Sequence, residues 1–203
     1  MTKIVAHLTG FEHEFVKVSN EEKEEYKKNT YSLGVFPYLK DESSGEGLGE
    51  SLAIARFMCN SKVESGLYGS SSYETACIDE VVEKHLFAHN QILSKIVPSI
   101  FGYGAVSEDV SKEVNKKLKD YVRTLDEQLK DKEYFVGGKL TLADVYVAVS
   151  LNILFATVLD SGFRKAVPNL MKWYENVRNQ EVFLNVLGKP RYCGKAFKPK
   201  IAQ

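Results

Sequence analysis

The sequence predicts an α+β protein in two parts, a small N-terminal half that contains strands and an all-helical C-terminal half. Three observations lead to this prediction. The segment Val145–Leu159 is apolar on every side and follows a capping signal, as in a helix buried in the middle of a domain. Apolar residues recur with a period of about 3.6 from residue 73 onward, whereas short alternating runs occupy the beginning of the chain. Residues 61–72 are rich in Ser and Gly and indicate a linker between the halves.

The capping signal consists of Thr141 and Asp144, which have the S/T-x-x-D/E spacing of a capping box. The threonine hydroxyl can accept the N–H of Asp144, and the carboxylate can accept the N–H of Thr141. Leu140 and Val145 have the spacing of a hydrophobic staple around this box. Boxes of this kind occur in many unrelated core helices, so the box alone predicts a helix start and no particular family.

Two short strands are predicted at the N-terminus, over Lys3–Leu8 and Glu14–Val18. Only Thr9–His13 separates them, and a parallel crossover needs about ten to twelve residues or more. We therefore expect an antiparallel hairpin with no helix between the strands. A second capping box at Ser19–Glu22 predicts a short, charged helix over Asn20–Lys28.

The rest of the N-terminal half predicts a strand, a hairpin tip and a helix. Leu33–Leu39 turns into a strand, Asp41–Gly47 has the composition of a hairpin tip, and a helix starts at Glu50–Met58. These elements place the first domain in residues 1–62.

The second domain is predicted over residues 73–190, and residues 191–203 form a polar, lysine-rich tail or linker. Its first helix should stop where Pro98–Gly104 breaks the pattern. Besides the capped helix, the predicted helices are Tyr73–Ile96, Asp109–Lys130, one with Pro168 in its first turn, and Val182–Leu187.

Composition excludes some classes of function. The 203 residues carry 27 basic and 27 acidic side chains, which argues against a general polyanion binder, so we expect no direct contact with nucleic acid. Three widely spaced cysteines fit reduced thiols in the cytoplasm. The four histidines form no metal-binding motif, and His85 and His89 are interpreted as a pair on a helix surface. No signal peptide or membrane span is predicted, so we expect no membrane contact.

Four segments, in this order along the chain, resemble the cytosolic glutathione transferases. They are Leu33-Gly34-x-x-Pro37, Glu50-Ser51-x-Ala53-Ile54, Tyr134–Asp144 and Pro168-x-x-x-x-Trp173. The resemblance implies the α+β two-part glutathione-transferase fold, with an all-α C-terminal half. The N-terminal half would be a reduced thioredoxin-like domain that lacks its first helix.

One branch of that family, the transferase-like domain of translation elongation factor 1B gamma, fits the C-terminal third best. The matching residues are Phe163-Arg164-Lys165-Ala166-x-Pro168-Asn169, Trp173, Asn179-Gln180, Phe183, Val186-Leu187-Gly188 and Cys193-x-Lys195. The resemblance ends where that branch's linker and separate C-terminal domain begin.

The resemblance implies a glutathione site in the N-terminal half. Pro37 would be cis, and the backbone of Phe36 would pair with the cysteinyl part of glutathione. Glu50 would pair with the ammonium group and Ser51 with the carboxylate at the γ-glutamyl end. The alternative is that Glu50 and Ser51 are ordinary helix-cap residues.

Catalysis needs a group that stabilises the glutathione thiolate. The family provides a Tyr, Ser or Cys at the junction of the first strand and first helix. At Leu8–Phe11 the only hydroxyl is that of Thr9, and no predicted helix follows. We therefore expect no catalytic residue beyond this weak candidate, and little or no transferase activity. No cofactor is required in this interpretation, although glutathione could bind.

The leading hypothesis is a scaffold that contacts the nucleotide-exchange subunit of elongation factor 1B. The alternatives are an active transferase that uses Thr9, Glu50 and Ser51, and an assembly domain associated with aminoacyl-tRNA synthetases. The family resemblance also implies a homodimer. In it, the N-terminal half of one subunit would pack on Tyr73–Ile96 and Asp109–Lys130 of the other.

Overall fold

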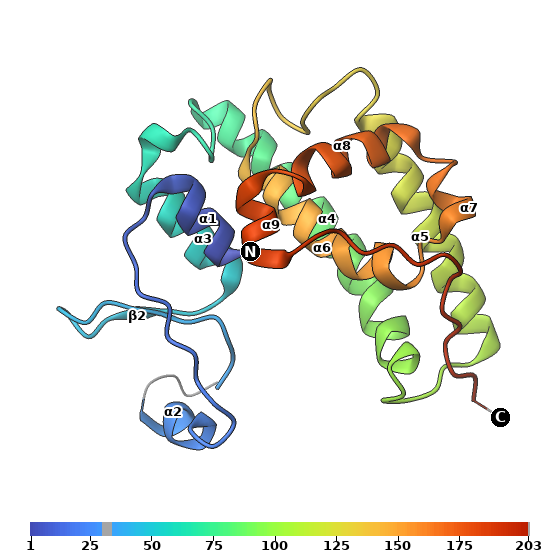
Figure 1. The fold of residues 1–203 in the computed structure, drawn as a ribbon, viewed down its shortest axis with the longest axis horizontal. Helices are drawn as coiled ribbons and strands as arrows, with labels where there is room; N and C mark the ends of the chain where they lie inside the picture. The colour runs from blue at the N-terminus through green and yellow to red at the C-terminus, as the bar shows by residue number, and fades with distance from the viewer. Residues whose placement is uncertain (30–33, 203) are drawn as a thin grey trace. The chain divides into compact units, whose positions relative to one another are not determined.

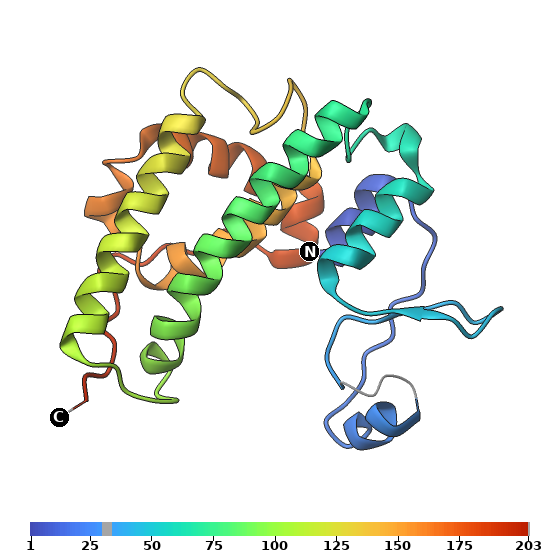
Figure 2. The same cartoon turned by 180° about the vertical axis from the view of Figure 1, so that it is seen from behind.

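The computed structural model describes residues 1–29 and 34–202 and divides into two compact units (Figures 1 and 2). The first unit runs from Met1 to Ser70, and the second from Ser71 to the C-terminus. The two units are described separately.

The chain begins with helix α1, Thr2–Thr9, where the sequence predicted a strand. Ile4, Val5 and Thr9 are buried, which is one face of a helix, and α1 packs along α3 (Figure 1). Gly10 ends the helix in the left-handed conformation, with φ at 67°, and its N–H donates to the carbonyl of Ala6. The predicted strand Lys3–Leu8 and its hairpin are therefore wrong, as is the expectation that the N-terminal half has no first helix.

The strand was predicted wrongly because the apolar run at the N-terminus is too short to show one clear period. Apolar residues at positions 4, 6 and 8 alternate as in a strand, while those at 4, 5 and 8 fit a helix. Eight residues do not separate the two periods. The sequence did contain one signal for a helix end, since Gly10 follows the run and glycine often adopts the left-handed conformation after a helix. Glu14–Val18 is likewise not a strand in the structure.

The second predicted capping box is confirmed. The backbone N–H of Ser19 donates to the Glu22 carboxylate at 2.8 Å, and the N–H of Glu22 donates to the Ser19 hydroxyl at 3.3 Å. Helix α2, Lys23–Asn29, follows directly. The predicted turn residue Leu33 lies outside the described residues.

The sheet of the first unit is a short antiparallel hairpin. Strand β1, Leu39–Lys40, pairs with β2, Gly47–Leu48, in the register Leu39 to Leu48. The tip is closed by the Asp41 N–H, which donates to the Glu46 carbonyl at 2.8 Å. The predicted hairpin tip is thus confirmed, while the strand before it is shorter than predicted.

Helix α3, Ser51–Ser61, supplies the other half of the first unit's core, and a 3-10 turn, η1, Val63–Ser65, follows it. Ile54, Ala55 and Met58 are buried on α3, which packs against α1. Burial of this face stabilises the pair, since apolar surface removed from water contributes about 25 cal/mol per Å².

The second unit is all-helical, as predicted. Its helices are α4, Ser72–Ile100; α5, Glu108–Gln128; α6, Leu142–Thr157; α7, Ser161–Arg164; α8, Pro168–Arg178; and α9, Glu181–Leu187. Helix α4 packs on α5 and α6, and α8 packs on the same two helices. Helix α6 therefore lies in the middle, which explains why all its sides are apolar.

Helix α4 extends further than predicted, because it continues through Pro98 to Ile100. Proline removes a single N–H donor, and here it stands only two residues before the last helical residue. The carbonyl of Pro98 still accepts the N–H of Tyr103 at 2.8 Å. The predicted break over Pro98–Gly104 is confirmed, while the predicted helix end at Ile96 is four residues too early.

The predicted capping box at α6 is confirmed and is the centre of a larger network. Both Thr141 and Asp144 are fully buried. The carboxylate of Asp144 accepts the N–H and hydroxyl of Thr141, at 2.9 and 2.8 Å. It also accepts the N–H of Phe135 at 3.0 Å and the indole N–H of Trp173 at 2.9 Å. One side chain thus connects α6, α8 and the α5–α6 loop.

The C-terminal tail is bound to the second unit along its backbone. The N–H groups of Cys193 and Phe197 donate to the carbonyls of Phe155 and Thr157, at 2.9 and 2.8 Å. These carbonyls lie in the last turn of α6, where no intrahelical donor is left for them. The tail then pairs with Val106, which stands before α5. No helix in the described part of the chain has the length and hydropathy to cross a membrane.

Replacement of Asp144 by alanine tests the network. We expect Asp144→Ala to lower the free energy of unfolding by about 3 kcal/mol, since four buried donors lose their acceptor and each unpaired group costs about 1–3 kcal/mol before relaxation. For a chain of this size the melting temperature should fall by roughly 6–12 °C in scanning calorimetry.

The matched control is Ser107→Ala at the start of α5. The Ser107 hydroxyl is exposed and accepts a single bond, from the Val110 N–H at 3.2 Å. Loss of an ordinary cap costs about 1 kcal/mol. Equal losses for the two variants would show that Asp144 does no more than cap its helix.

Candidate functional site

The first candidate site is the start of α3 in the first unit. The Phe36–Pro37 peptide bond is cis, as the family resemblance implied. Ser51 is the first residue of α3, and Glu50 occupies the N-cap position. The cis bond of Phe36 and Pro37 and the helix start at Glu50 and Ser51 thus have the backbone geometry that the prediction required, and the Phe36 side chain is 51% exposed.

The backbone of Glu50 is unusual. Its φ is 65°, a left-handed value that non-glycine residues rarely adopt and that costs of the order of 1 kcal/mol or more. Its side chain forms no hydrogen bond that caps the helix. Helix capping alone therefore does not account for Glu50. The first N–H groups of α3 point outward at a positive helix end, a geometry that suits a carboxylate.

Thr9, the weak catalytic candidate, lies at the C-terminal end of a helix. It is the last residue of α1, it is 7% exposed, and its hydroxyl donates to the Val5 carbonyl at 2.8 Å. A helix C-terminus carries partial negative charge, which raises the pKa of a nearby thiol. This position therefore does not favour a thiolate.

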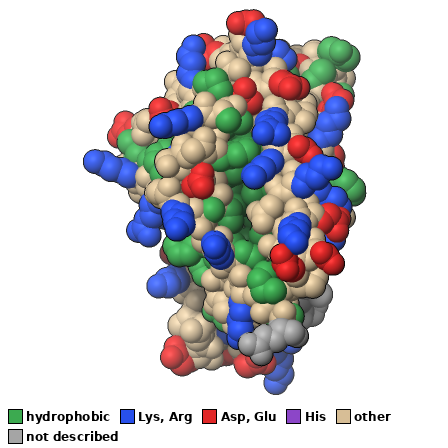
Figure 3. Space-filling view, turned by 90° about the vertical axis from the view of Figure 1, so that its right-hand side faces the viewer, with side chains coloured by type: hydrophobic (Ala, Val, Ile, Leu, Met, Phe, Trp, Pro, Cys, Tyr) green, Lys and Arg blue, Asp and Glu red, His purple; other side chains and the backbone are tan. Residues whose placement is uncertain are grey.

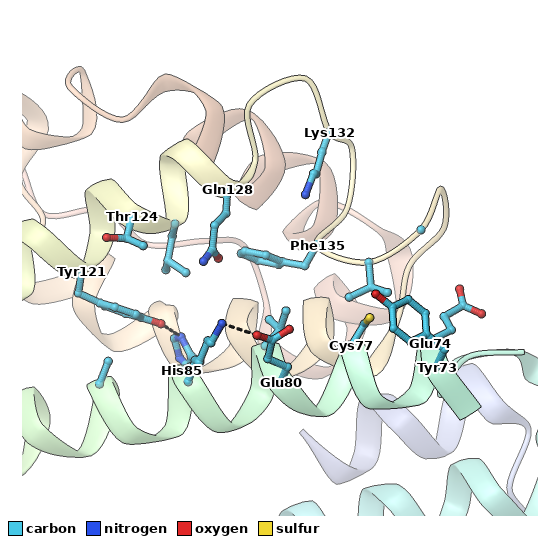
Figure 4. A pocket seen from close by; sticks show the side chains of 16 residues that line it. Tyr73, Glu74, Cys77, Glu80, His85, Tyr121, Thr124, Gln128, Lys132 and Phe135 are labelled. Atoms are coloured by element: carbon cyan, nitrogen blue, oxygen red, sulfur yellow. Dashed lines mark hydrogen bonds and ion pairs between the residues drawn. The ribbon is translucent and has the colours of Figure 1, made fainter. Parts of the chain in front are cut away.

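The second candidate site is a groove in the second unit, with a volume of about 640 Å³ (Figure 4). It runs between α4 and α5 and is closed at one end by the loop 132–137. We call it the α4–α5 groove. Its lining residues are Tyr73, Glu74, Cys77, Glu80, Val81, Lys84, His85, Ala88, Tyr121, Thr124, Leu125, Gln128, Lys132, Phe135, Val136 and Gly137.

The lining of the groove is mainly apolar, with charged groups at the edge. Tyr73 is 82% exposed at one end, while Phe135 is buried at the wall. Glu80 and Lys84 form an ion pair along the edge of α4. Gly137 has a φ of 67°, so any other residue there would be strained, and a Cβ would lie 3.0 Å from the Glu74 carboxylate.

His85 lies buried at the floor of the groove, where its Nδ1 forms a hydrogen bond with the Tyr121 hydroxyl (Figure 4). Burial, with the nearby His89, lowers the pKa of His85 to about 3. Burial also lowers the pKa of His89 and raises that of Tyr121. Both imidazoles are therefore neutral at pH 7. In the described part of the chain, Nε2 of His85 and Nδ1 of His89 have no hydrogen-bond partner.

The interpretation of His85 and His89 as a surface pair is wrong for His85. The signal that could have placed it inside was its register, because Ile78, Val82 and His85 follow the spacing of one buried helix face. Its partner Tyr121 comes from another helix and could not be identified from spacing. Across residues 1–29 and 34–202, no group of three or more histidine, cysteine or acidic side chains could hold a metal ion.

Comparison with known proteins identifies the family. A model of the glutathione S-transferase N-terminal domain matches residues 2–65, and one of the C-terminal domain matches residues 87–181. The chain belongs to the glutathione S-transferase family. The two matches together cover most of the chain and correspond to its two units.

The relatives of this transferase-family chain include elongation factor 1-gamma proteins. It is 30% identical over 176 residues to elongation factor 1-gamma of Artemia salina, which covers 84% of this chain and 39% of that protein. It is 32% identical over 193 residues to elongation factor 1-gamma 2 of Oryza sativa, which covers 91% of this chain and 44% of that protein. The chain thus spans about two fifths of the length of these relatives.

A solved structure supports the fold. The GST-like domain of elongation factor 1-gamma from Saccharomyces cerevisiae aligns with a TM-score of 0.85, covering 98% of this chain and 92% of that one. The sequence identity is 16%, so the likeness concerns the fold. The predicted two-part transferase fold with a helical C-terminal half is confirmed.

Proposed function

We propose that this chain is an assembly domain of the elongation factor 1B gamma type, which holds protein partners and does not depend on catalysis. The similarity to proteins named elongation factor 1-gamma extends over most of the chain and supports this. By this proposal it acts in the cytoplasm, as a scaffold for the complex that exchanges guanine nucleotide on elongation factor 1A.

The observation that carries the proposal is the α4–α5 groove. It is long, open and mainly apolar, and apolar area is what a protein partner buries. A catalytic site would instead need a group that activates a thiol. The one hydroxyl at the expected junction, that of Thr9, is bound to the carbonyls of its own helix.

The occupant we propose for the groove is a second copy of the chain. The family resemblance pairs the N-terminal half of one subunit with the first two helices of the other's helical half, which are α4 and α5 here. An exposed aromatic residue, Tyr73, marks one end of this surface. Aromatic side chains are enriched among interface residues that dominate affinity.

The dimer is tested by a charge placed in the groove. We expect the wild-type chain to sediment at twice its own mass at micromolar concentration, and Val81→Arg to sediment as a monomer. An arginine in an apolar contact leaves a charge unpaired, which should weaken the dimer by about 2 kcal/mol or more.

Asn90→Arg is the control, since Asn90 is exposed on another side of α4 and does not line the groove. It should remain dimeric. A wild-type monomer, or a Val81→Arg variant that is as dimeric as the wild type, would contradict the proposed occupant.

The scaffold proposal itself is tested with purified partners. We expect the immobilised chain to retain the nucleotide-exchange subunit of elongation factor 1B, with no turnover of a chromogenic electrophile in the presence of glutathione. Retention of aminoacyl-tRNA synthetases alone would favour the synthetase-associated function. Turnover without retention of either would favour an active transferase.

Glutathione binding is a second candidate function, favoured by the left-handed Glu50 and the outward N–H groups of α3. Calorimetric titration should detect glutathione binding, and Ser51→Ala should weaken it by about tenfold, the loss of one hydrogen bond to a charged group. Ser61→Ala, at the far end of α3, is the control, because the Ser61 hydroxyl donates to the carbonyl of Phe57. Equal affinity of Ser51→Ala and wild type would remove Ser51 from the site.

A further inference from the structure

Helix α5 carries a straight row of basic side chains on its outer surface. Lys112, Lys116, Lys119 and Arg123 are spaced by four, three and four residues, so they share one side of the helix over about 16 Å. We call them the α5 basic row. All four are exposed, and with Asn115 and Asp120 they line a shallow hollow of about 460 Å³.

The α5 basic row is not neutralised by its neighbours. Lys112 pairs with Glu108 at 2.7 Å and Arg123 with Asp120 at 3.8 Å, both exposed pairs at the ends of the row. Exposed pairs of this kind contribute little, because water and salt screen them. Within the described residues, Lys116 and Lys119 in the middle have no acidic partner.

The like charges of the row repel one another, because its three successive pairs stand three or four residues apart. Elsewhere on α5, and on α4, charges of opposite sign pair at this spacing, as Lys117 does with Glu113 and Lys84 with Glu80. Over residues 112–123 five basic side chains stand against two acidic ones, so the row is a local concentration of positive charge. An anionic partner would relieve it.

The tail adds apolar and basic groups near the start of the same helix. Phe197 and Ile201 are 56% and 42% exposed, and Lys198 and Lys200 flank them. Hydrogen bonds between Lys200, Ala202 and Val106 fix this part of the tail beside the start of α5. Figure 3 shows an apolar strip on this side of the molecule, with Lys and Arg side chains around it and Asp and Glu side chains among them.

The spacing of the row favours a peptide over a nucleic acid. A nucleic-acid strand presents about one phosphate per 3.4 Å, and its binding depends on many such contacts. The row offers one cation per 4.5–6 Å, which is the rise of three or four residues in a helix, and its two end residues already pair with carboxylates. A second helix with acidic residues at the same spacing would match each cation, as charges do across a coiled coil.

We propose that the α5 basic row binds an acidic, amphipathic helix of a partner protein, with carboxylates on the row and apolar residues against the exposed strip. This site is separate from the α4–α5 groove and does not depend on the dimer. Its binding weakens with added salt, because exposed charges are screened.

The test uses a fluorescent helical peptide with glutamates at the four-three-four spacing and leucines along one edge. Its affinity is measured by anisotropy at low and high NaCl, beside a scrambled peptide of the same composition. We expect the matched peptide to bind more tightly than the scrambled one, and Lys116→Glu/Lys119→Glu to weaken it by about tenfold or more. The neutral variant Lys116→Gln/Lys119→Gln should bind the peptide with an affinity between those of the wild type and the charge-reversed variant. Such a graded effect excludes misfolding as the cause.

The matched control is Lys17→Glu/Lys189→Glu, which changes the net charge equally at exposed positions outside α5. It should bind the peptide as the wild type does. Equal binding of the matched and scrambled peptides, or no effect of charge reversal in the row, would overturn the proposal. A single-stranded RNA is tested at the same salt concentration. If it binds more tightly than the peptide, and the charge-reversed variant no longer binds it, the proposal is overturned, since the partner would then be a nucleic acid.

Discussion

The second unit depends on the carboxylate of Asp144, which is fully buried and accepts four hydrogen bonds. Burial raises the pKa of this carboxyl, and the four donors oppose that rise. The donors come from the α5–α6 loop, the cap of α6 and the middle of α8. Phe135 is one of these donors and also lines the α4–α5 groove. The carboxylate that caps the central helix therefore also holds the groove wall in place.

The sequence could predict the local part of this network and not the tertiary part. The spacing of Thr141 and Asp144 is enough for the capping box, because both partners lie within one helical turn. The bond from Trp173 spans 29 residues and depends on how α8 packs on α6. His85 combines both cases, because its register with Ile78 and Val82 was a local signal for burial, while its partner Tyr121, 36 residues away, could not be identified from spacing. At α1 the error had another cause, because a run of eight residues fits both the two-residue period of a strand and the 3.6-residue period of a helix.

The start of α3 shows what a family resemblance adds to local reasoning. Residue patterns alone do not predict a cis bond at Pro37, which the resemblance implied and the structure contains, while neither predicted the positive φ of Glu50. The prediction for Thr9 rested on the wrong element, because the hydroxyl lies at the end of a helix and not between two strands. The expectation of weak catalysis keeps a physical basis all the same, since a helix C-terminus and a carbonyl-bound hydroxyl both disfavour a thiolate.

The two binding surfaces that we propose lie on different sides of helix α5. Tyr121, Thr124 and Gln128 face the groove (Figure 4), while Lys116 and Lys119 are turned from them by about 80–180°, at 100° per residue. A rigid helix with both sides in use can bind two partners at once without a conformational change. A protein that assembles a complex needs such an arrangement, whereas an enzyme with one pocket does not. The positions of the two surfaces on α5 are therefore consistent with the proposed assembly role.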